Sequence, residues 1–235
     1  MRSSIKAVVF DLDSTLCEYA LTVAEVIERA LSHVGLEPLE FGPIDSLADD
    51  YNRAWWTAED NYRTHVDELR RLAWSALLRD RGRDDEELAG KLSSAYSQIR
   101  KETGLRLFDG VSQLIDDLKP RYPLGIVTNG PSDMQWPKLR ELGLVDRFDG
   151  IVVAGDRGFF KPDPRPFVEI LELLDAEAKT ALFVGDSFEH DIIGAHGAGM
   201  RTAWIRSDGK TPPEDADVTP DYIFGSAIEV REIMQ

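Results

Sequence analysis

The sequence predicts an α/β protein built on a doubly wound parallel sheet, with a small all-helical region inserted after the first strand. Three observations lead to this fold class. Short runs that are apolar at every position recur along the chain, as expected of parallel strands covered on both faces. Amphipathic helical patterns alternate with these runs over most of the chain. Between about residues 18 and 104 the alternation stops, and only helical patterns remain.

The predicted strands are short and fall at six places in the chain. They are Ala7–Phe10, Leu124–Val127, Ile151–Val153, Ala181–Val184, Thr202–Ile205 and Tyr222–Phe224. Apolar residues recur at helical spacing between them, in segments 111–118, 139–144 and 167–174. Gly104 and Gly143 stand where two of the predicted helices end, as glycine often does. The alternation therefore predicts strand, helix and strand repeated around one sheet.

The segment without strands carries three amphipathic helical patterns, at 23–34, 69–77 and 88–99. We therefore predict an α/β core made of residues 1–17 and 105–235, and a helical cap made of residues 18–104. Ligands of open α/β sheets bind beyond the carboxyl ends of the strands. An insert that begins directly after the first strand is predicted to act as a lid over that region.

Composition narrows the possible functions. A chain of 235 residues with 43% hydrophobic content can bury a sizeable core. The net charge of −16 argues against a nucleic-acid partner, because binding to the phosphate backbone draws on clustered basic residues. No run approaches the length of a membrane span, the start of the chain lacks a signal-peptide pattern, and Cys17 is the only cysteine. These features predict a cytoplasmic protein, and the acidic composition is also that of proteins from high-salt hosts.

Polar motifs follow four of the predicted strands or the loops beyond them. They contribute Asp11, Asp13, Thr128, Asn129, Lys161, Asp186 and Asp191. The carboxyl ends of parallel strands meet at one edge of a sheet, so we expect these residues to share a site. Two carboxylates two residues apart in extended chain point the same way and repel each other. A divalent cation relieves that repulsion, and hard oxygen ligands beside a phosphate favour Mg²⁺.

This set of groups suits transfer of a phosphoryl group. One carboxylate of the Asp11–Asp13 pair attacks phosphorus and becomes an aspartyl-phosphate. The other donates a proton to the leaving alcohol and later accepts one from water. The hydroxyl of Thr128 and the ammonium of Lys161 suit the oxygens of the phosphoryl group, where charge is held in the transition state.

The ordered motifs resemble those of the haloacid dehalogenase (HAD) superfamily of hydrolases, in the branch with a helical cap that includes phosphoglycolate phosphatases and nucleotidases. The resemblance covers nearly the whole chain. It implies that Asp11 is the nucleophile and Asp13 the acid/base, and that Thr128, Asn129 and Lys161 bind phosphate. It also implies that Mg²⁺ is held by Asp11, by the backbone carbonyl of Asp13 and by Asp186. Asp191 would support the metal or orient Lys161.

The resemblance implies a phosphatase that acts on a small phosphorylated metabolite, as a monomer or homodimer. Members that remove halogen lack the second aspartate, so Asp13 favours phosphoryl chemistry. Phosphomutases or phosphotransferases keep both aspartates and stay open as an alternative, as does a catalytically silent binding protein with this fold. The substrate is not determined by the motifs. In the cap, arginines at four positions could contact a second anionic group; they are Arg53, Arg63, Arg70 and Arg71.

Overall fold

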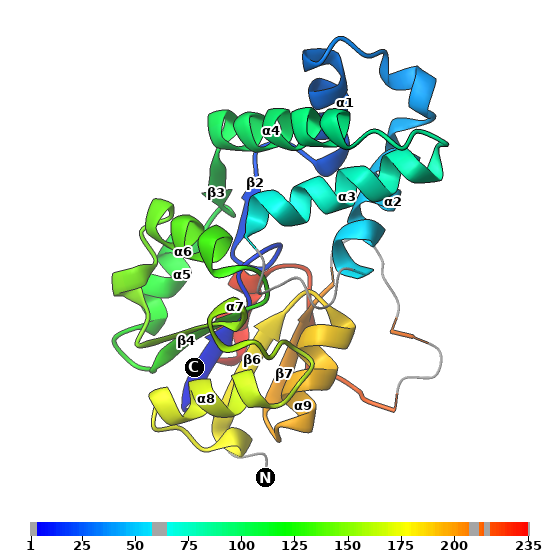
Figure 1. Ribbon diagram of the computed structural model, residues 1–235. Coiled ribbons are helices and arrows are strands. Elements are labelled where there is room, and N and C mark those ends of the chain that lie inside the picture. The colour runs from blue at the N-terminus through cyan, green and yellow to red at the C-terminus, as the bar shows by residue number, and fades with distance from the viewer. Residues whose placement is uncertain (1–3, 58–64, 207–211, 214–216, 235) are drawn as a thin grey trace. The chain divides into compact units, whose positions relative to one another are not determined.

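Six parallel strands form the main sheet of the computed structural model, which describes residues 4–57, 65–206, 212–213 and 217–234 (Figure 1). Their order across the sheet is β5-β4-β1-β6-β7-β8. The strands are β1 (Ala7–Phe10), β4 (Leu124–Thr128), β5 (Gly150–Val153), β6 (Ala181–Gly185), β7 (Arg201–Ile205) and β8 (Tyr222–Phe224). The six predicted strands and the predicted fold class are therefore confirmed.

Strand β1 lies in the middle of the sheet and pairs in parallel on both sides. Val8 is in register with Leu124 of β4 on one side and with Leu182 of β6 on the other. From β1 the chain goes to β4 and β5 in one direction, and then returns to add β6, β7 and β8 in the other. The carboxyl end of β1 is thus the point where the strand order reverses, which is where sheets of this type bind ligands.

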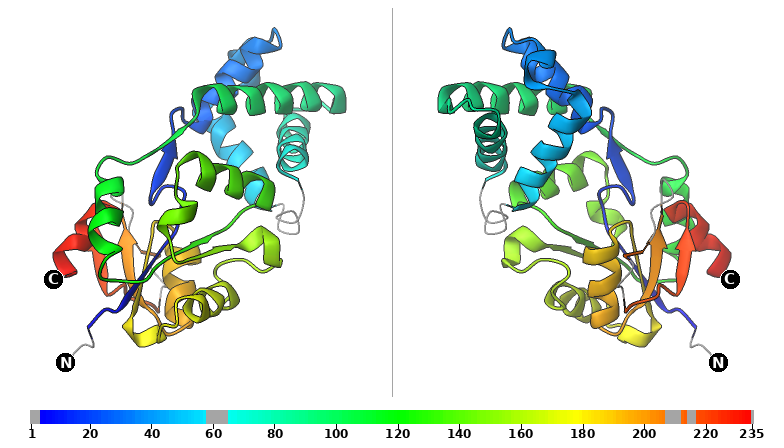
Figure 2. Two further views of the ribbon diagram at one scale, coloured as in Figure 1. Left: turned by 90° about the vertical axis from the view of Figure 1, so that its left-hand side faces the viewer. Right: turned by 90° about the vertical axis from the view of Figure 1, so that its right-hand side faces the viewer.

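Helices cover both faces of this sheet. Figure 2 shows α5 and the C-terminal turns on one side of the strands, and α8 and α9 on the other. The helices of this part of the chain are α5 (Val111–Leu118), α6 (Ser132–Glu141), α7 (Ala154–Arg157), α8 (Arg165–Leu173) and α9 (Gly194–Gly197), with 3₁₀ turns η3 (Val145–Arg147), η4 (Ala178–Thr180) and η6 (Ala227–Ile233). Every residue of β1, β4 and β6 is buried, which confirms that these strands are covered on both faces.

The close approach of α8 to the sheet depends on small residues in the strands. A Cβ atom at Gly125 of β4 would lie 2.7 Å from Cγ1 of Ile170, well inside van der Waals contact. Ile170 packs there in a core cluster with Val9 of β1 and Phe183 of β6. The apolar residues at helical spacing in segment 167–174 therefore face the sheet.

The chain divides into two compact units, residues 1–18 with 107–235, and Tyr19–Arg106. These limits lie one or two residues from the boundaries expected from the sequence. Two short strands, β2 (Cys17–Tyr19) and β3 (Leu105–Leu107), pair where the chain enters and leaves the second unit. This two-stranded sheet was not predicted from the sequence, because strands of three residues are too short to show a periodic pattern.

The second unit is helical apart from these strand ends, within the residues that the structure describes. Its helices are α1 (Val23–His33), α2 (Ile44–Thr57), α3 (Val66–Asp80) and α4 (Glu86–Thr103), with a 3₁₀ turn η1 (Pro38–Phe41). Thr22 and Glu25 form a capping box at the start of α1, which satisfies free N–H groups there. The rings of Tyr51, Trp74 and Tyr96 pack together in the core of the unit. In the described part of the chain, no helix combines the length and apolar character needed to cross a membrane.

Candidate active site

Three of the predicted site residues lie at the carboxyl ends of adjacent strands. Asp11 directly follows β1, Thr128 is the last residue of β4, and Asp186 directly follows β6. Because β1 pairs in parallel with both β4 and β6, these three ends meet at one edge of the sheet. The backbone N–H of Asp11 donates to the carbonyl of Val184 at 2.9 Å, so the strand pairing continues to the aspartate itself.

Lys161 reaches the same edge from the loop between α7 and α8. Its ammonium nitrogen Nζ lies 2.6 Å from Oδ1 of Asp11 and 2.6 Å from Oδ1 of Asp191. It also donates to the carbonyl oxygen of Val127 at 3.0 Å. Only 2% of the Lys161 side chain is exposed, and a buried ammonium is costly unless it is paired. The two carboxylates compensate this charge, and in turn Lys161 fixes the direction of the Asp11 carboxylate.

The side chain of Asn129 anchors the loop that carries Lys161. Its Oδ1 accepts from the backbone N–H of Lys161, and its Nδ2 donates to the backbone carbonyl of the same residue, both at 2.9 Å. These two bonds join the end of β4 to the loop. The amide of Asn129 therefore positions the lysine, and contact between Asn129 and a phosphate stays a prediction.

Asp191 lies in the π-helical turn η5 (Phe188–Ile193), and each of its carboxylate oxygens accepts a hydrogen bond. Oδ1 accepts from Lys161, and Oδ2 accepts from the backbone N–H of Ser187 at 2.9 Å. Gly185 makes this position possible, because a Cβ atom there would lie 2.4 Å from Oδ2 of Asp191. The side chain of Asp191 thus orients Lys161 and fixes the loop that follows Asp186.

Asp11, Asp186 and Asp191 form a carboxylate cluster in which one oxygen of each lies within 4.8 Å of the others. Burial raises the pKa of Asp11 to about 8; the nearby Lys161 opposes this shift, and the negative charges of Asp191 and Asp186 add to it. An ordinary aspartate is ionised well below pH 7. The raised pKa of Asp11 therefore reflects its burial among carboxylates, and carboxylate oxygens are the ligands that a hard divalent cation prefers.

The carboxylate of Asp13 faces α6 rather than this cluster. Nζ of Lys138 lies 2.8 Å from Oδ1 and 2.9 Å from Oδ2 of Asp13, and Nε2 of Gln135 lies 2.8 Å from Oδ2. Partial burial acts to raise the pKa of Asp13, but the ammonium of Lys138 and the hydrogen bonds from Lys138 and Gln135 hold it below its ordinary value. The two aspartates of the motif therefore have opposite pKa shifts.

Gln135 and Lys138 are site residues that the sequence analysis missed. They are three apart in α6 and so lie on the same face of the helix. That face is buried, since Gln135 is 0% and Lys138 5% exposed. The sequence did contain one signal of this buried polar face: a glutamine and a lysine three residues apart, with the apolar Leu139 next to the lysine. The signal was weak, because helices commonly carry such residues on a solvent face.

Three of the four cap arginines named in the sequence analysis pair with carboxylates of their own unit. Arg53 pairs with Asp50, and Arg70 pairs with Asp67 and donates to the hydroxyl of Ser97. The remaining arginine, Arg71, pairs with Glu68 and with Glu86. Arg63 lies outside the described residues. The contacts of the three described arginines are those of structural ion pairs.

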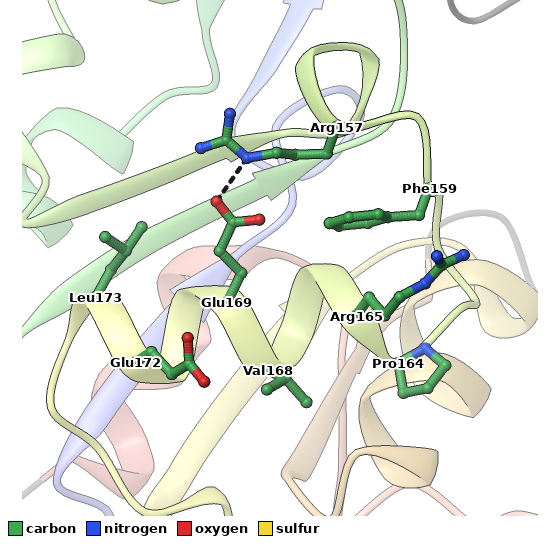
Figure 3. A pocket seen from close by; sticks show the side chains of 8 residues that line it. All are labelled: Arg157, Phe159, Pro164, Arg165, Val168, Glu169, Glu172 and Leu173. Atoms are coloured by element: carbon green, nitrogen blue, oxygen red, sulfur yellow. Dashed lines mark hydrogen bonds and ion pairs between the residues drawn. The ribbon is translucent and has the colours of Figure 1, made fainter.

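A separate surface pocket of about 720 Å³ lies beside α8 and contains none of the seven predicted site residues. Figure 3 shows Arg157 directed toward Glu169, to which its Nε donates at 2.7 Å, and Phe159 close to Arg165. The guanidinium of Arg165 lies 4.7 Å from the centroid of the Phe159 ring and is also paired with Asp163. The positive charges of both arginines in the pocket are thus already balanced by nearby carboxylates.

Comparison with known proteins identifies the family to which this site belongs. The family described as haloacid dehalogenase-like hydrolases matches residues 5–199. The chain belongs to this family. The HAD-like hydrolase is 30% identical over 230 residues to the protein of Bacillus subtilis (strain 168) named HAD-hydrolase YfnB, with 97% of this chain and 95% of the relative covered. The predicted resemblance and the prediction of a hydrolase are confirmed.

Other relatives of the HAD-like hydrolase carry the names of phosphatases. It is 27% identical to the N-acylneuraminate-9-phosphatase of Mus musculus, covering 99% of this chain and 95% of that protein. It is 29% identical to the glyceraldehyde 3-phosphate phosphatase of Methanopyrus kandleri, covering 98% of this chain and 97% of that protein. Among solved structures, YfnB of Bacillus subtilis bound to magnesium matches with a TM-score of 0.79, 27% identity and 99% of each chain covered.

Proposed function

We propose that this HAD-like hydrolase is a Mg²⁺-dependent phosphatase, which hydrolyses a small phosphomonoester through an aspartyl-phosphate on Asp11. The observation that carries the proposal is the convergence of Asp11, Lys161 and Thr128 at the carboxyl ends of β1 and β4, with Asp13 two residues beyond Asp11. Relatives named as phosphatases of small phosphate esters, matched over nearly their whole length, support the same activity.

The charges of the site fit a divalent cation. Four carboxylates, those of Asp11, Asp13, Asp186 and Asp191, face two ammonium groups, those of Lys138 and Lys161. When all of these groups are ionised, two negative charges remain, which one Mg²⁺ would neutralise. Asp11, Asp186 and the backbone carbonyl of Asp13 would hold the ion, and Asp191 would support it. When bound, the ion supplies positive charge that lets an anionic nucleophile approach an anionic phosphate.

The reaction proceeds in two steps with this chain's residues in separate roles. In the first, an oxygen of Asp11 attacks phosphorus, the bond from phosphorus to the ester oxygen breaks, and Asp13 gives a proton to the leaving oxygen. In the second, water attacks the aspartyl-phosphate and loses a proton to Asp13, which releases phosphate and restores the Asp11 carboxylate. Asp13 is ionised at rest, and the negative charge of a bound phosphate favours its protonation before the first step.

Thr128 and Lys161 bind the phosphoryl oxygens in this proposal, together with Asn129. The hydroxyl of Thr128 is buried at the end of β4, and Lys161 already contacts the nucleophile. The hydroxyl of Thr128 donates to the carbonyl oxygen of Asn129 at 3.3 Å and would turn from it to a bound phosphate. Donors placed beside the phosphoryl oxygens stabilise the charge that develops in the transition state. We further propose that residues 18–104 act as a cap that determines which ester is accepted, since they are inserted directly after the strand that carries Asp11.

A screen for phosphate release tests the proposed function. The purified protein, assayed with Mg²⁺ against glycolate phosphate, sugar phosphates, sugar-acid phosphates and nucleoside monophosphates, is expected to release inorganic phosphate from at least one of them. Removal of divalent cations by EDTA is expected to abolish the release, and added Mg²⁺ to restore it. Conversion of a sugar phosphate to an isomer without phosphate release would show a phosphomutase instead, and no turnover of any ester would contradict the proposal.

The affinity of the site for Mg²⁺ is expected to rise with pH up to about 8. A protonated carboxyl group binds a cation poorly, and the metal-free protein holds a proton on Asp11 below its raised pKa of about 8. Binding of Mg²⁺ at pH 7 should therefore release a proton, whereas binding above pH 9 should not. Titration calorimetry in buffers of different ionisation enthalpy measures this proton release. An affinity that does not change between pH 6 and 9 would contradict the assignment of Asp11 as a ligand.

A further inference from the structure

The Asp13 carboxylate is held along one edge by two side chains of α6. Lys138 contacts both of its oxygens, at 2.8 and 2.9 Å, and Gln135 contacts Oδ2 at 2.8 Å. Lys138 and Gln135 are themselves almost completely buried, so their positions are fixed by the surrounding protein. The Asp13 side chain, in contrast, remains 40% exposed. The edge of the carboxylate that α6 does not bind is therefore open to a substrate.

Gln135 also connects Asp13 to the end of β4. Its Nε2 lies 2.6 Å from Oγ1 of Thr128 and 2.7 Å from the carbonyl oxygen of Asn129, in addition to its contact with Asp13. Asp13 Oδ2 and the Asn129 carbonyl oxygen can only accept, so the two N–H groups of Nε2 face them, and this determines the orientation of the amide. Its oxygen Oε1 is buried and has no hydrogen-bond partner among the described residues. An unpaired buried acceptor is unfavourable, so Oε1 does not stabilise this arrangement. The hydrogen bonds that Gln135 contributes are those donated by Nε2.

Each aspartate of the motif is thus held by a different buried lysine. Asp11 is held by Lys161 from the loop before α8, and Asp13 is held by Lys138 from α6. The two lysines come from separate segments. A change at Lys138 can therefore alter the placement of Asp13 while the contact between Lys161 and Asp11 is kept.

We propose that Lys138 and Gln135 are positioning residues for proton transfer, which hold the Asp13 carboxylate where it meets the ester oxygen of the substrate. This inference rests on the proposed function. In the step that they serve, the Asp11 oxygen forms a bond to phosphorus, the phosphorus–ester bond breaks, and the proton of the Asp13 carboxyl group moves to the departing oxygen. Neither Lys138 nor Gln135 touches the reacting atoms in this account, because both act through Asp13.

The dependence of the reaction on the leaving group tests this role. An alkoxide is a strong base and must be protonated as it departs, whereas nitrophenolate is a weak base and leaves without a proton. With enzyme in excess over substrate, release of the leaving group reports the first step alone. We test an alkyl phosphate that is a substrate of the wild type. Lys138→Met is expected to slow release of its alcohol at least about 10-fold. This loss is part of the roughly 10²–10⁴-fold rate enhancement that a correctly placed general acid contributes. Release of nitrophenolate from p-nitrophenyl phosphate should change by less than about 3-fold.

Further variants separate positioning from a general effect on the fold. Lys138→Arg keeps the charge and the donors and is expected to recover most of the alkyl phosphate rate. Gln135→Leu should show the same selectivity for the alkyl ester, with a raised KM for both esters because Thr128 loses a hydrogen-bond donor. Lys119→Met removes a lysine that pairs with Asp149 at the surface and is the matched control, expected to leave both rates unchanged.

Several outcomes would overturn the inference. Equal losses with both esters in Lys138→Met would show a structural or phosphate-binding role, and unchanged rates with both would show that Lys138 does not position Asp13. A wild-type protein that releases the leaving group from neither ester would overturn the proposed function itself, and the inference would fall with it.

Discussion

Asp11→Asn is expected to abolish phosphate release while the protein stays folded. The amide cannot form the aspartyl-phosphate, so turnover should fall on the order of 10⁴-fold or more, as when covalent nucleophiles are removed from other hydrolases. Asparagine has nearly the same shape, and its Oδ1 can still accept from Lys161, which lies 2.6 Å from the present carboxylate oxygen. The measurement is kcat for phosphate release together with the thermal unfolding midpoint, which should stay close to that of the wild type.

A second readout identifies the covalent intermediate directly. Wild-type protein quenched in acid during turnover should carry one added phosphoryl group by mass spectrometry, and Asp11→Asn should carry none. Asp116→Asn is the matched control, because Asp116 lies at the surface and pairs with Arg147. If Asp11→Asn kept the full Mg²⁺-dependent activity of the wild type, the assignment of the nucleophile would be wrong.

Lys161→Met is expected to destabilise the metal-free protein by about 3–5 kcal/mol at alkaline pH, because it leaves the buried Asp11 and Asp191 without their shared cation. The effect should depend on pH. The pKa of Asp11 is raised in the folded wild type. The protonated carboxyl group of Asp11 therefore contributes stability that is fully present below the ordinary aspartate pKa and is lost as the pH rises through about 8. Without Lys161 the pKa of Asp11 rises further, so the deficit should be smaller at pH 5 than above pH 8.

Urea unfolding at pH 5 and pH 9, with and without Mg²⁺, measures this dependence. Mg²⁺ should restore part of the lost stability, because it supplies positive charge to the same carboxylates. Lys179→Met, which removes an exposed partner of Glu177, is the control and should change the free energy of unfolding by less than about 0.5 kcal/mol. An unchanged unfolding midpoint for Lys161→Met at pH 9 would show that the ammonium does not compensate these carboxylates.

The sequence predicted the sheet well because its strands are buried on both faces. Runs such as Ala7–Phe10 and Ala181–Val184 are apolar throughout, and few other structures require that pattern. The meeting of Asp11, Thr128 and Asp186 followed from the strand order, since parallel strands end at one edge. Lys161 and Asp191 lie farther from the strand ends, after α7 and within η5, and were predicted from the motifs that contain them.

The contacts of Asp13 could not be predicted in the same way. Gln135 and Lys138 lie more than a hundred positions from Asp13 in the chain, and their side chains are typical of an exposed helix surface. Only the packing of α6 turns this face inward, and the local sequence gives just a weak signal of it, the apolar Leu139 next to Lys138. The paired strands β2 and β3 were missed for a related reason, because their pairing depends on where the chain leaves and re-enters the first unit.

The central position of β1 has a consequence for how the protein is made. Val8 pairs with Leu124 and Leu182, which are synthesised only after the whole helical unit. Closing such long loops is slow, whereas the helical unit can form from contacts that are nearer in sequence. During translation the apolar β1 segment therefore stays unpaired until β4 and β6 have been synthesised. An unpaired hydrophobic strand is prone to aggregate. Expression yield should thus be sensitive to growth temperature and to chaperone supply even when the finished enzyme is stable.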